Sequence, residues 1–78
     1  MTLDDQIKST IKEVMSIDVS KFDKNRKINT ISEWDSFNNL MLISRFQDDL
    51  HIEFTAAEIE ATQTIGALFV LIHAKMKK

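Results

Sequence analysis

The chain has 78 residues, no cysteine and a formal net charge of -2. A chain of this length forms one domain with a small core, and without cysteine or a metal-spaced His/Asp/Glu cluster neither a disulfide nor a structural zinc ion stabilises it. The small negative charge argues against binding to nucleic-acid phosphates, and no apolar run is long enough to span a membrane. Because MTLDDQIKST carries acids where a secretory signal would be basic, we expect a single cytoplasmic domain over residues 1–78, acting as a monomer.

A first helix is predicted over residues 3–15. Its apolar residues recur at spacings of four, four and three, which is typical of one buried helix face: Leu3, Ile7, Ile11 and Val14. Thr2 stands directly before this face, where its hydroxyl can cap the helix.

Residues 16–35 follow neither a helical nor a strand period, and they predict a long connection. Loops longer than about 12 to 15 residues are uncommon in compact domains. Large apolar residues are spread along this one, so we expect them to hold it on the core: Ile17, Val19, Phe22, Ile28, Ile31 and Trp34. Four of the ten basic residues also lie here and are interpreted as solvated surface: Lys21, Lys24, Arg26 and Lys27.

A second helix is predicted over residues 36–50, with either Asp35 or Ser36 at its N-terminus as the capping residue. Its inner face is expected to contain five regularly spaced apolar residues, with Leu42 beside them: Phe37, Leu40, Ile43, Phe46 and Leu50.

Two helices are predicted in the remainder of the chain. Thr55 and Glu58 form a capping box before a helix of at most two turns. Thr64 then caps a last helix, whose inner face is expected to contain Ile65, Leu68, Phe69, Ile72 and Met76. The predicted fold is all-α: a small four-helix bundle with three longer helices, one short helix, and a long loop between the first two helices.

Ser36, in EWDSFNNLML, stands out because a hydroxyl at a helix start is exposed. A nucleophilic serine needs a base within hydrogen-bonding distance, and His51 would lie roughly 20 Å away along the helix. His73 lies late in the last helix. There is also no Gly-x-Ser-x-Gly motif and no glycine-rich loop, so we do not expect the chain to be an enzyme.

The motif Asp35-Ser36-Phe37 resembles the Asp-Ser-Leu attachment motif of the acyl carrier protein family, the phosphopantetheine-binding carrier domains. An amphipathic helix follows the motif in both. The C-terminal stretch DLHIEFTAAEIEATQTIGALFVLI is similar to the usual ending of the family, with a short third helix and a threonine-capped last helix. The resemblance covers nearly the whole chain in length, helix order and loop placement.

The resemblance implies that Ser36 receives 4'-phosphopantetheine from coenzyme A, in a reaction performed by a separate phosphopantetheinyl transferase. The thiol of that arm would hold acyl or aminoacyl groups as thioesters and present them to loading and acyl-transfer enzymes. Asp35 would help to orient the transferase or its metal, although capping alone also explains an acid there. The pathway, whether fatty acid, polyketide, peptide or polysaccharide biosynthesis, stays open.

The chain departs from the family pattern at several positions. Trp34 replaces the common glycine, Phe37 replaces leucine, and the second helix has acids only in its last turn, so electrostatic steering should be weak. These features resemble specialised stand-alone carriers more than the fatty-acid carrier. Met41 lies off the predicted inner face and is expected to contact partner enzymes. Phe37 is assigned equally to partner binding and to the core.

The alternative is a helical protein-interaction module without a prosthetic group. In that case Ser36 would serve only as an N-cap, and the exposed face of the second helix would bind the partner. Modification of Ser36 by a transferase separates the two hypotheses.

Overall fold

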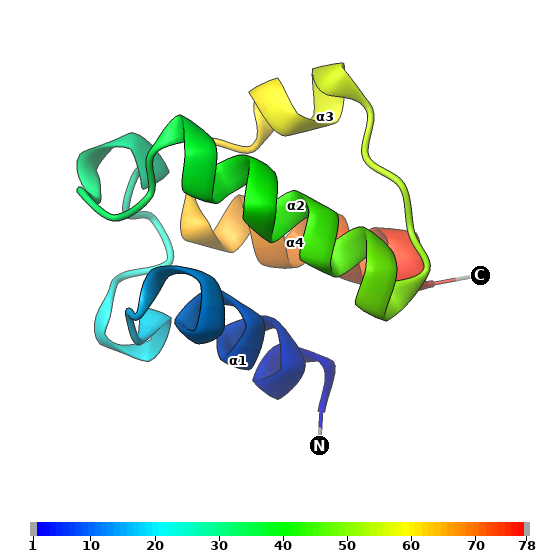
Figure 1. Cartoon of the computed structure of the whole chain (residues 1–78), viewed down its shortest axis with the longest axis horizontal. Helices are drawn as coiled ribbons and strands as arrows, with labels where there is room; N and C mark the ends of the chain where they lie inside the picture. Colours follow the sequence, from blue (N-terminus) through cyan, green and yellow to red (C-terminus); the bar gives the residue numbers. More distant parts are fainter. Residues whose placement is uncertain (1, 78) are drawn as a thin grey trace.

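A computed structural model describes residues 2–77 and contains four α-helices (Figure 1). They are α1 (Leu3–Met15), α2 (Ser36–Leu50), α3 (Ala56–Ala61) and α4 (Ile65–Met76). Within residues 2–77 no β-strand is present, which confirms the all-α class. The radius of gyration is 11.4 Å, close to the roughly 11.5 Å expected for a folded chain of this length. None of the helices in this part of the chain is long and apolar enough to cross a bilayer.

Threonine side chains begin three of the four helices, as predicted. The hydroxyls of Thr2 and Thr64 each accept a hydrogen bond from a first-turn N–H, at 3.1 Å in both cases. Thr55 and Glu58 form the reciprocal capping box: Thr55 Oγ1 accepts from the Glu58 N–H, and Glu58 Oε1 accepts from the Thr55 N–H. These bonds satisfy N–H groups that no helical carbonyl can reach, so the predicted helix starts are confirmed.

The core lies where α1 packs against α2 and α4. In Figure 1, α4 lies behind α2, and α1 runs below both. Each of the three longer helices contributes two of the largest fully buried side chains: Ile7 and Ile11, Leu42 and Phe46, and Leu68 and Ile72.

The connection between α1 and α2 contains two single-turn 3₁₀ helices, η1 (Val19–Lys21) and η2 (Ile28–Thr30). The prediction that its apolar residues hold it on the core is confirmed. Four of them are buried: Ile17, Val19, Ile31 and Trp34. Two more are partly buried against the core: Phe22 and Ile28.

The connection also pairs with the chain segment that leads into α4. Residues 24–28 and residues 63–66 run side by side and exchange backbone hydrogen bonds. The bonds join the Ile28 N–H to the Gln63 carbonyl (2.9 Å), the Ile65 N–H to the Arg26 carbonyl (3.2 Å) and the Gly66 N–H to the Lys24 carbonyl (2.8 Å). These two paired segments fix the N-terminus of α4 against the long connection.

Gly66→Ala is expected to destabilise the fold by about 1 kcal/mol, within the range for overpacking. A methyl group at this position would lie 3.1 Å from the Lys24 carbonyl oxygen and 3.3 Å from Lys24 Cβ. That oxygen cannot retreat without lengthening its bond to the Gly66 N–H. The cost should exceed the gain of about 1 kcal/mol that alanine brings to a helix. Urea unfolding measures it, and a stabilised variant would contradict the expectation.

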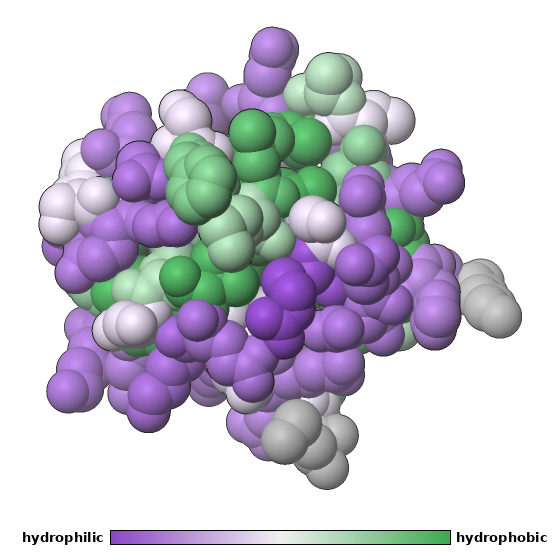
Figure 2. All heavy atoms as spheres, in the orientation of Figure 1, coloured by the Kyte–Doolittle hydropathy of each residue, from purple (hydrophilic) through white to green (hydrophobic). Residues whose placement is uncertain are grey.

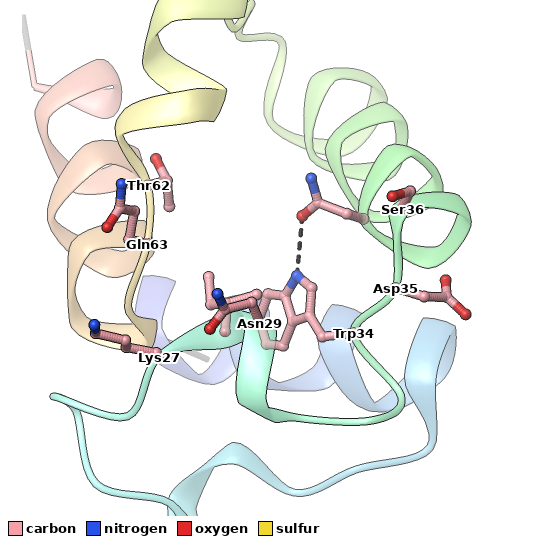
Figure 3. Close-up of a pocket in the computed structure, with 9 residues that line it drawn as sticks. Lys27, Asn29, Trp34, Asp35, Ser36, Thr62 and Gln63 are labelled. Carbon is pink, nitrogen blue, oxygen red and sulfur yellow. Dashed lines mark hydrogen bonds between the residues drawn. The ribbon is translucent and has the colours of Figure 1, made fainter.

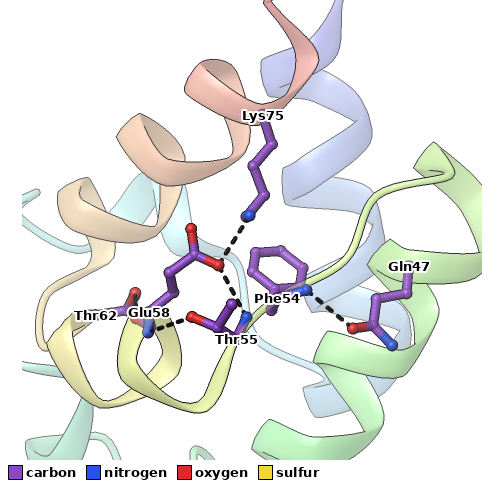
Figure 4. A network of polar contacts seen from close by, with 6 residues as sticks. All are labelled: Gln47, Phe54, Thr55, Glu58, Thr62 and Lys75. Carbon is purple, nitrogen blue, oxygen red and sulfur yellow. Dashed lines mark hydrogen bonds and ion pairs between the residues drawn. The ribbon is translucent and has the colours of Figure 1, made fainter.

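The six-residue helix α3 has no buried residue and depends on polar contacts with its neighbours. Lys75 on α4 donates to Glu58 at 2.9 Å and lies 5.6 Å from the centre of the Phe54 ring, while Gln47 on α2 accepts from the Phe54 N–H (Figure 4). The hydrogen bond from Lys75, together with that from the Thr55 backbone, lowers the pKa of Glu58 below its usual value. The contact is therefore present at neutral pH and lost only as the pH falls through that lowered pKa.

Two of the predicted inner faces are wrong in part. Phe37 and Leu40 were placed on the buried face of the second helix, yet they are 70% and 63% exposed. Met76, assigned to the inner face of the last helix, is 40% exposed because it lies in the final turn, beyond the core. The remaining inner-face residues of these helices are buried or partly buried, as predicted.

Candidate functional site

Ser36 is the first residue of α2, and its side chain is exposed. Asp35 precedes it in an extended conformation, and Asp35 Oδ1 accepts a hydrogen bond from the Asn38 N–H at 2.8 Å. Of the two capping residues that the sequence allowed, Asp35 is therefore the N-cap. The capping bond leaves the Ser36 hydroxyl available at the positive end of the helix dipole.

Two asparagines in the first turn of α2 form hydrogen bonds with the end of the long connection. Asn38 Nδ2 donates to the Glu33 carbonyl at 2.8 Å, and Asn39 Oδ1 accepts from the indole N–H of Trp34 at 2.9 Å. Because these amides face inward, the apolar neighbours on the same turn point outward. This explains why Phe37 is exposed, and it overturns the alternative that Phe37 is core.

A cavity of about 350 Å³ opens beside Ser36, between the start of α2, η2 and the segment that joins α3 to α4. In Figure 3 the Trp34 indole and Asn29 lie between Ser36 on one side and Thr62 with Gln63 on the other. Trp34 is only 5% exposed and forms part of the core. The cavity is therefore shallow, because the indole separates it from the interior.

Seven of the nine residues that line this cavity are polar or charged, and Ile28 and Trp34 add apolar surface. Within residues 2–77 the side-chain amides of Asn29 and Gln63 have no hydrogen-bond partner, while the Thr62 hydroxyl donates to the Glu58 carbonyl at 2.7 Å. Neither histidine lines the cavity, and His73 Nε2 lies 2.6 Å from Asp4 Oδ1. Ser36 therefore has amides, a hydroxyl and an indole beside it.

An apolar patch lies next to Ser36 on the outer face of α2. Phe37, Leu40 and Met41 form it, with exposed fractions of 70%, 63% and 44%. Figure 2 shows green apolar atoms gathered over α2 within a largely polar surface. The prediction that Met41 lies off the inner face of the second helix is confirmed, whereas its contact with partner enzymes stays a prediction. Leu40 belongs to the same patch but was not predicted as a site residue. Its spacing of three from Phe37, which places the two side chains on one face of a helix, was the sequence signal that could have identified it.

Acids are sparse near Ser36 on the same face. Asp48 and Asp49 lie in the last turns of α2, and Asp49 is 3.7 Å from Arg45. Arg45 also pairs with Glu13 of α1, and this contact raises the pKa of the Arg45 guanidinium. The charged part of α2 thus lies toward its C-terminal end and is partly neutralised.

Of the nine residues that line the cavity, only Asp35 and Ser36 were predicted from the sequence as site residues, and the seven that were missed include Lys27, Asn29 and Gln63. They come from the long connection and from the segment before α4, which only the pairing of residues 24–28 with 63–66 brings together. No model of a protein family matches this chain. A search of curated proteins also finds no match. The function is accordingly inferred from the geometry of Ser36 and its surroundings.

Proposed function

We propose that the chain is a carrier protein whose Ser36 bears a 4'-phosphopantetheine arm. In the attachment step Ser36 Oγ attacks the phosphorus next to the pantetheine of coenzyme A. The pyrophosphate bond breaks, adenosine 3',5'-bisphosphate leaves, and a base on the transferase takes the serine proton. The arm ends in a thiol that carries acyl or aminoacyl groups as thioesters. The protein itself presents the cargo and leaves catalysis to its partners.

One observation carries the proposal: an exposed Ser36 hydroxyl, free of capping, at the first residue of a helix. Asp35 takes the capping role, so the serine is not needed to start the helix. The positive end of the α2 dipole favours a phosphate at this position. We infer a small acyl-carrier-like four-helix bundle with a long first loop, acting in the cytoplasm, and the packing of α1 on α2 and α4 supports this architecture.

Incubation with coenzyme A and a broad-specificity phosphopantetheinyl transferase tests the proposal. The intact mass should rise by one phosphopantetheine group, and peptide mapping should place it on Ser36. A chain that stays unmodified, beside a known carrier domain modified in the same tube, would contradict the proposal.

The apolar patch of Phe37, Leu40 and Met41 is the proposed contact surface for loading and acyl-transfer enzymes. Large apolar side chains beside the attachment point can fill pockets on a partner, as the central residues of interfaces do. The second candidate function, an interaction module without a prosthetic group, is favoured by this same patch. The modification experiment above separates the two functions.

Met41→Glu should lower the rate of loading by the cognate enzyme about tenfold or more, because a charge would be desolvated in the interface. The free energy of unfolding should change by less than about 0.5 kcal/mol, as is usual for surface substitutions. Val70→Glu is the matched control, since Val70 is a similarly exposed apolar residue (69%) on a different helix, α4. Equal loading of both variants would remove Met41 from the interface.

The loading rate should depend weakly on salt. Exposed charges are screened over about 10 Å at 0.1 M ionic strength, and the two acids of α2 lie in its last turns. We expect a change of less than about threefold between roughly 50 and 300 mM salt, after subtraction of the effect on the enzyme alone. A fall of about tenfold would mean that acids elsewhere, such as Glu33, Glu58 or Glu60, form the docking face.

A further inference from the structure

The cavity beside Ser36 differs in character from a larger cavity formed by other residues of the described chain. We propose that it receives the cargo end of the arm, and that it fits short acyl groups with neutral hydrogen-bonding substituents, hydroxyl or amide, in preference to long alkyl chains. This inference rests on the proposed attachment of phosphopantetheine to Ser36. An arm attached at the edge of the cavity can fold back over it.

Hydrogen-bonding capacity is the first line of support. The amides of Asn29 and Gln63 have no partner within residues 2–77, and Asn39 uses its oxygen for the Trp34 indole, so its NH₂ group remains available. These groups can donate to and accept from a hydroxyl or an amide. An alkyl chain in the same place would remove them from water without giving them partners.

Charge is the second line of support. Lys27 and Asp35 both line the cavity. Their formal charges are opposite, so the cavity has no strong preference for an anion or a cation. A neutral polar group fits this balance better than a carboxylate or an ammonium.

The separation of this cavity from a more apolar one is the third line of support. A larger cavity of about 730 Å³ has apolar walls that include Phe22, Ile65 and Phe69, and it shares no lining residue with the cavity at Ser36. The hydrogen-bonded segments 24–28 and 63–66 contribute to both cavities, at different positions along their length. With Trp34 closing the inner side, an alkyl chain on the arm would find apolar side chains only at Ile28 and Trp34, among seven polar or charged lining residues.

The experiment compares three cargoes on the same protein. Butyryl, 3-hydroxybutyryl and octanoyl arms are transferred from the corresponding coenzyme A thioesters, and intact mass confirms each product. Trp34 is the only tryptophan of the chain, so its emission reports on the cavity. The thermal midpoint is measured in parallel, with the unacylated holo protein as reference.

The 3-hydroxybutyryl form should shift the Trp34 emission and melt about 2 °C or more above the butyryl form. The octanoyl form should melt within about 2 °C of the holo protein, whereas a chain buried in apolar surroundings would raise the midpoint by more than about 10 °C. Such a rise would overturn the inference, and so would equal emission and melting for the hydroxylated and plain butyryl forms.

Leucine variants provide a second readout. Asn29→Leu and Gln63→Leu should each abolish the difference between the hydroxylated and plain butyryl forms, while Asn25→Leu, an exposed amide outside this cavity, should preserve it. A difference that survives in both lining variants would overturn the assignment. If no cargo attaches at all, the proposed function fails; if cargo attaches without discrimination, only this inference fails.

Discussion

Ser36→Ala should lose all modification by a phosphopantetheinyl transferase. Phosphopantetheine transfer needs an oxygen nucleophile, and alanine offers none. The variant should keep its unmodified mass under conditions in which the wild-type protein is fully converted. Ser44→Ala is the matched control, because Ser44 is also an exposed serine of α2, and it should be modified at the wild-type rate.

The same variant should remain folded. Because Asp35 is the N-cap of α2, removal of the Ser36 hydroxyl should cost less than about 0.5 kcal/mol, as for an ordinary surface substitution. A capping serine would have cost about 0.5 to 2 kcal/mol. Modification of the Ser36→Ala chain at another hydroxyl would show that the attachment residue is misassigned.

The helices could be predicted from the sequence because their signals are local. A hydroxyl followed by a free first-turn N–H forms the same bond in almost any context, which is why Thr2, Thr55 and Thr64 were recognised as helix starts. The spacing of Ile7 and Ile11, or of Leu68 and Ile72, also fixes a face without knowledge of the neighbours.

The direction of the first α2 turn could not be predicted in this way. Periodicity predicts that Phe37 and Leu40 lie on the inner face because it considers only the removal of apolar side chains from water. It does not consider the hydrogen-bond partners that polar side chains of the same turn can find inside the protein. The structure adds partners from residues 33–34, which bind Asn38 and Asn39 and rotate the amides inward. A polar side chain with two good partners can occupy an inner position at little cost.

The cavity was beyond sequence reasoning for a related reason. Its walls come from residues 27–29, from the start of α2 and from residues 62–63, and nothing local marks these segments as neighbours. Their proximity follows from backbone bonds between residues 24–28 and 63–66. Such pairings depend on the whole fold, whereas the exposed Ser36 depends only on its place at a helix start.

Trp34→Ala is expected to be the most destabilising of these substitutions, at about 3 to 5 kcal/mol. The Trp34 side chain packs in the core and holds the end of the long connection against α2, where it also donates to Asn39. A chain of this length has a total stability of roughly 4 to 12 kcal/mol, so the loss would be a large part of it. Urea unfolding followed by far-ultraviolet circular dichroism measures it, since the variant has no tryptophan.

Trp34→Phe separates packing from hydrogen bonding. Phenylalanine keeps most of the apolar contact but cannot donate to Asn39 Oδ1, which then borders the cavity and can be hydrated. We therefore expect a loss nearer to 1 kcal/mol from the missing bond, plus a smaller loss from reduced volume. An Asn39→Ala partner variant completes a double-mutant cycle, whose coupling energy isolates the indole–amide bond. A loss of less than about 1 kcal/mol for Trp34→Ala would be well below the usual range for a buried tryptophan. It would contradict the role of the indole in holding the long connection against α2 and in closing the inner side of the Ser36 cavity.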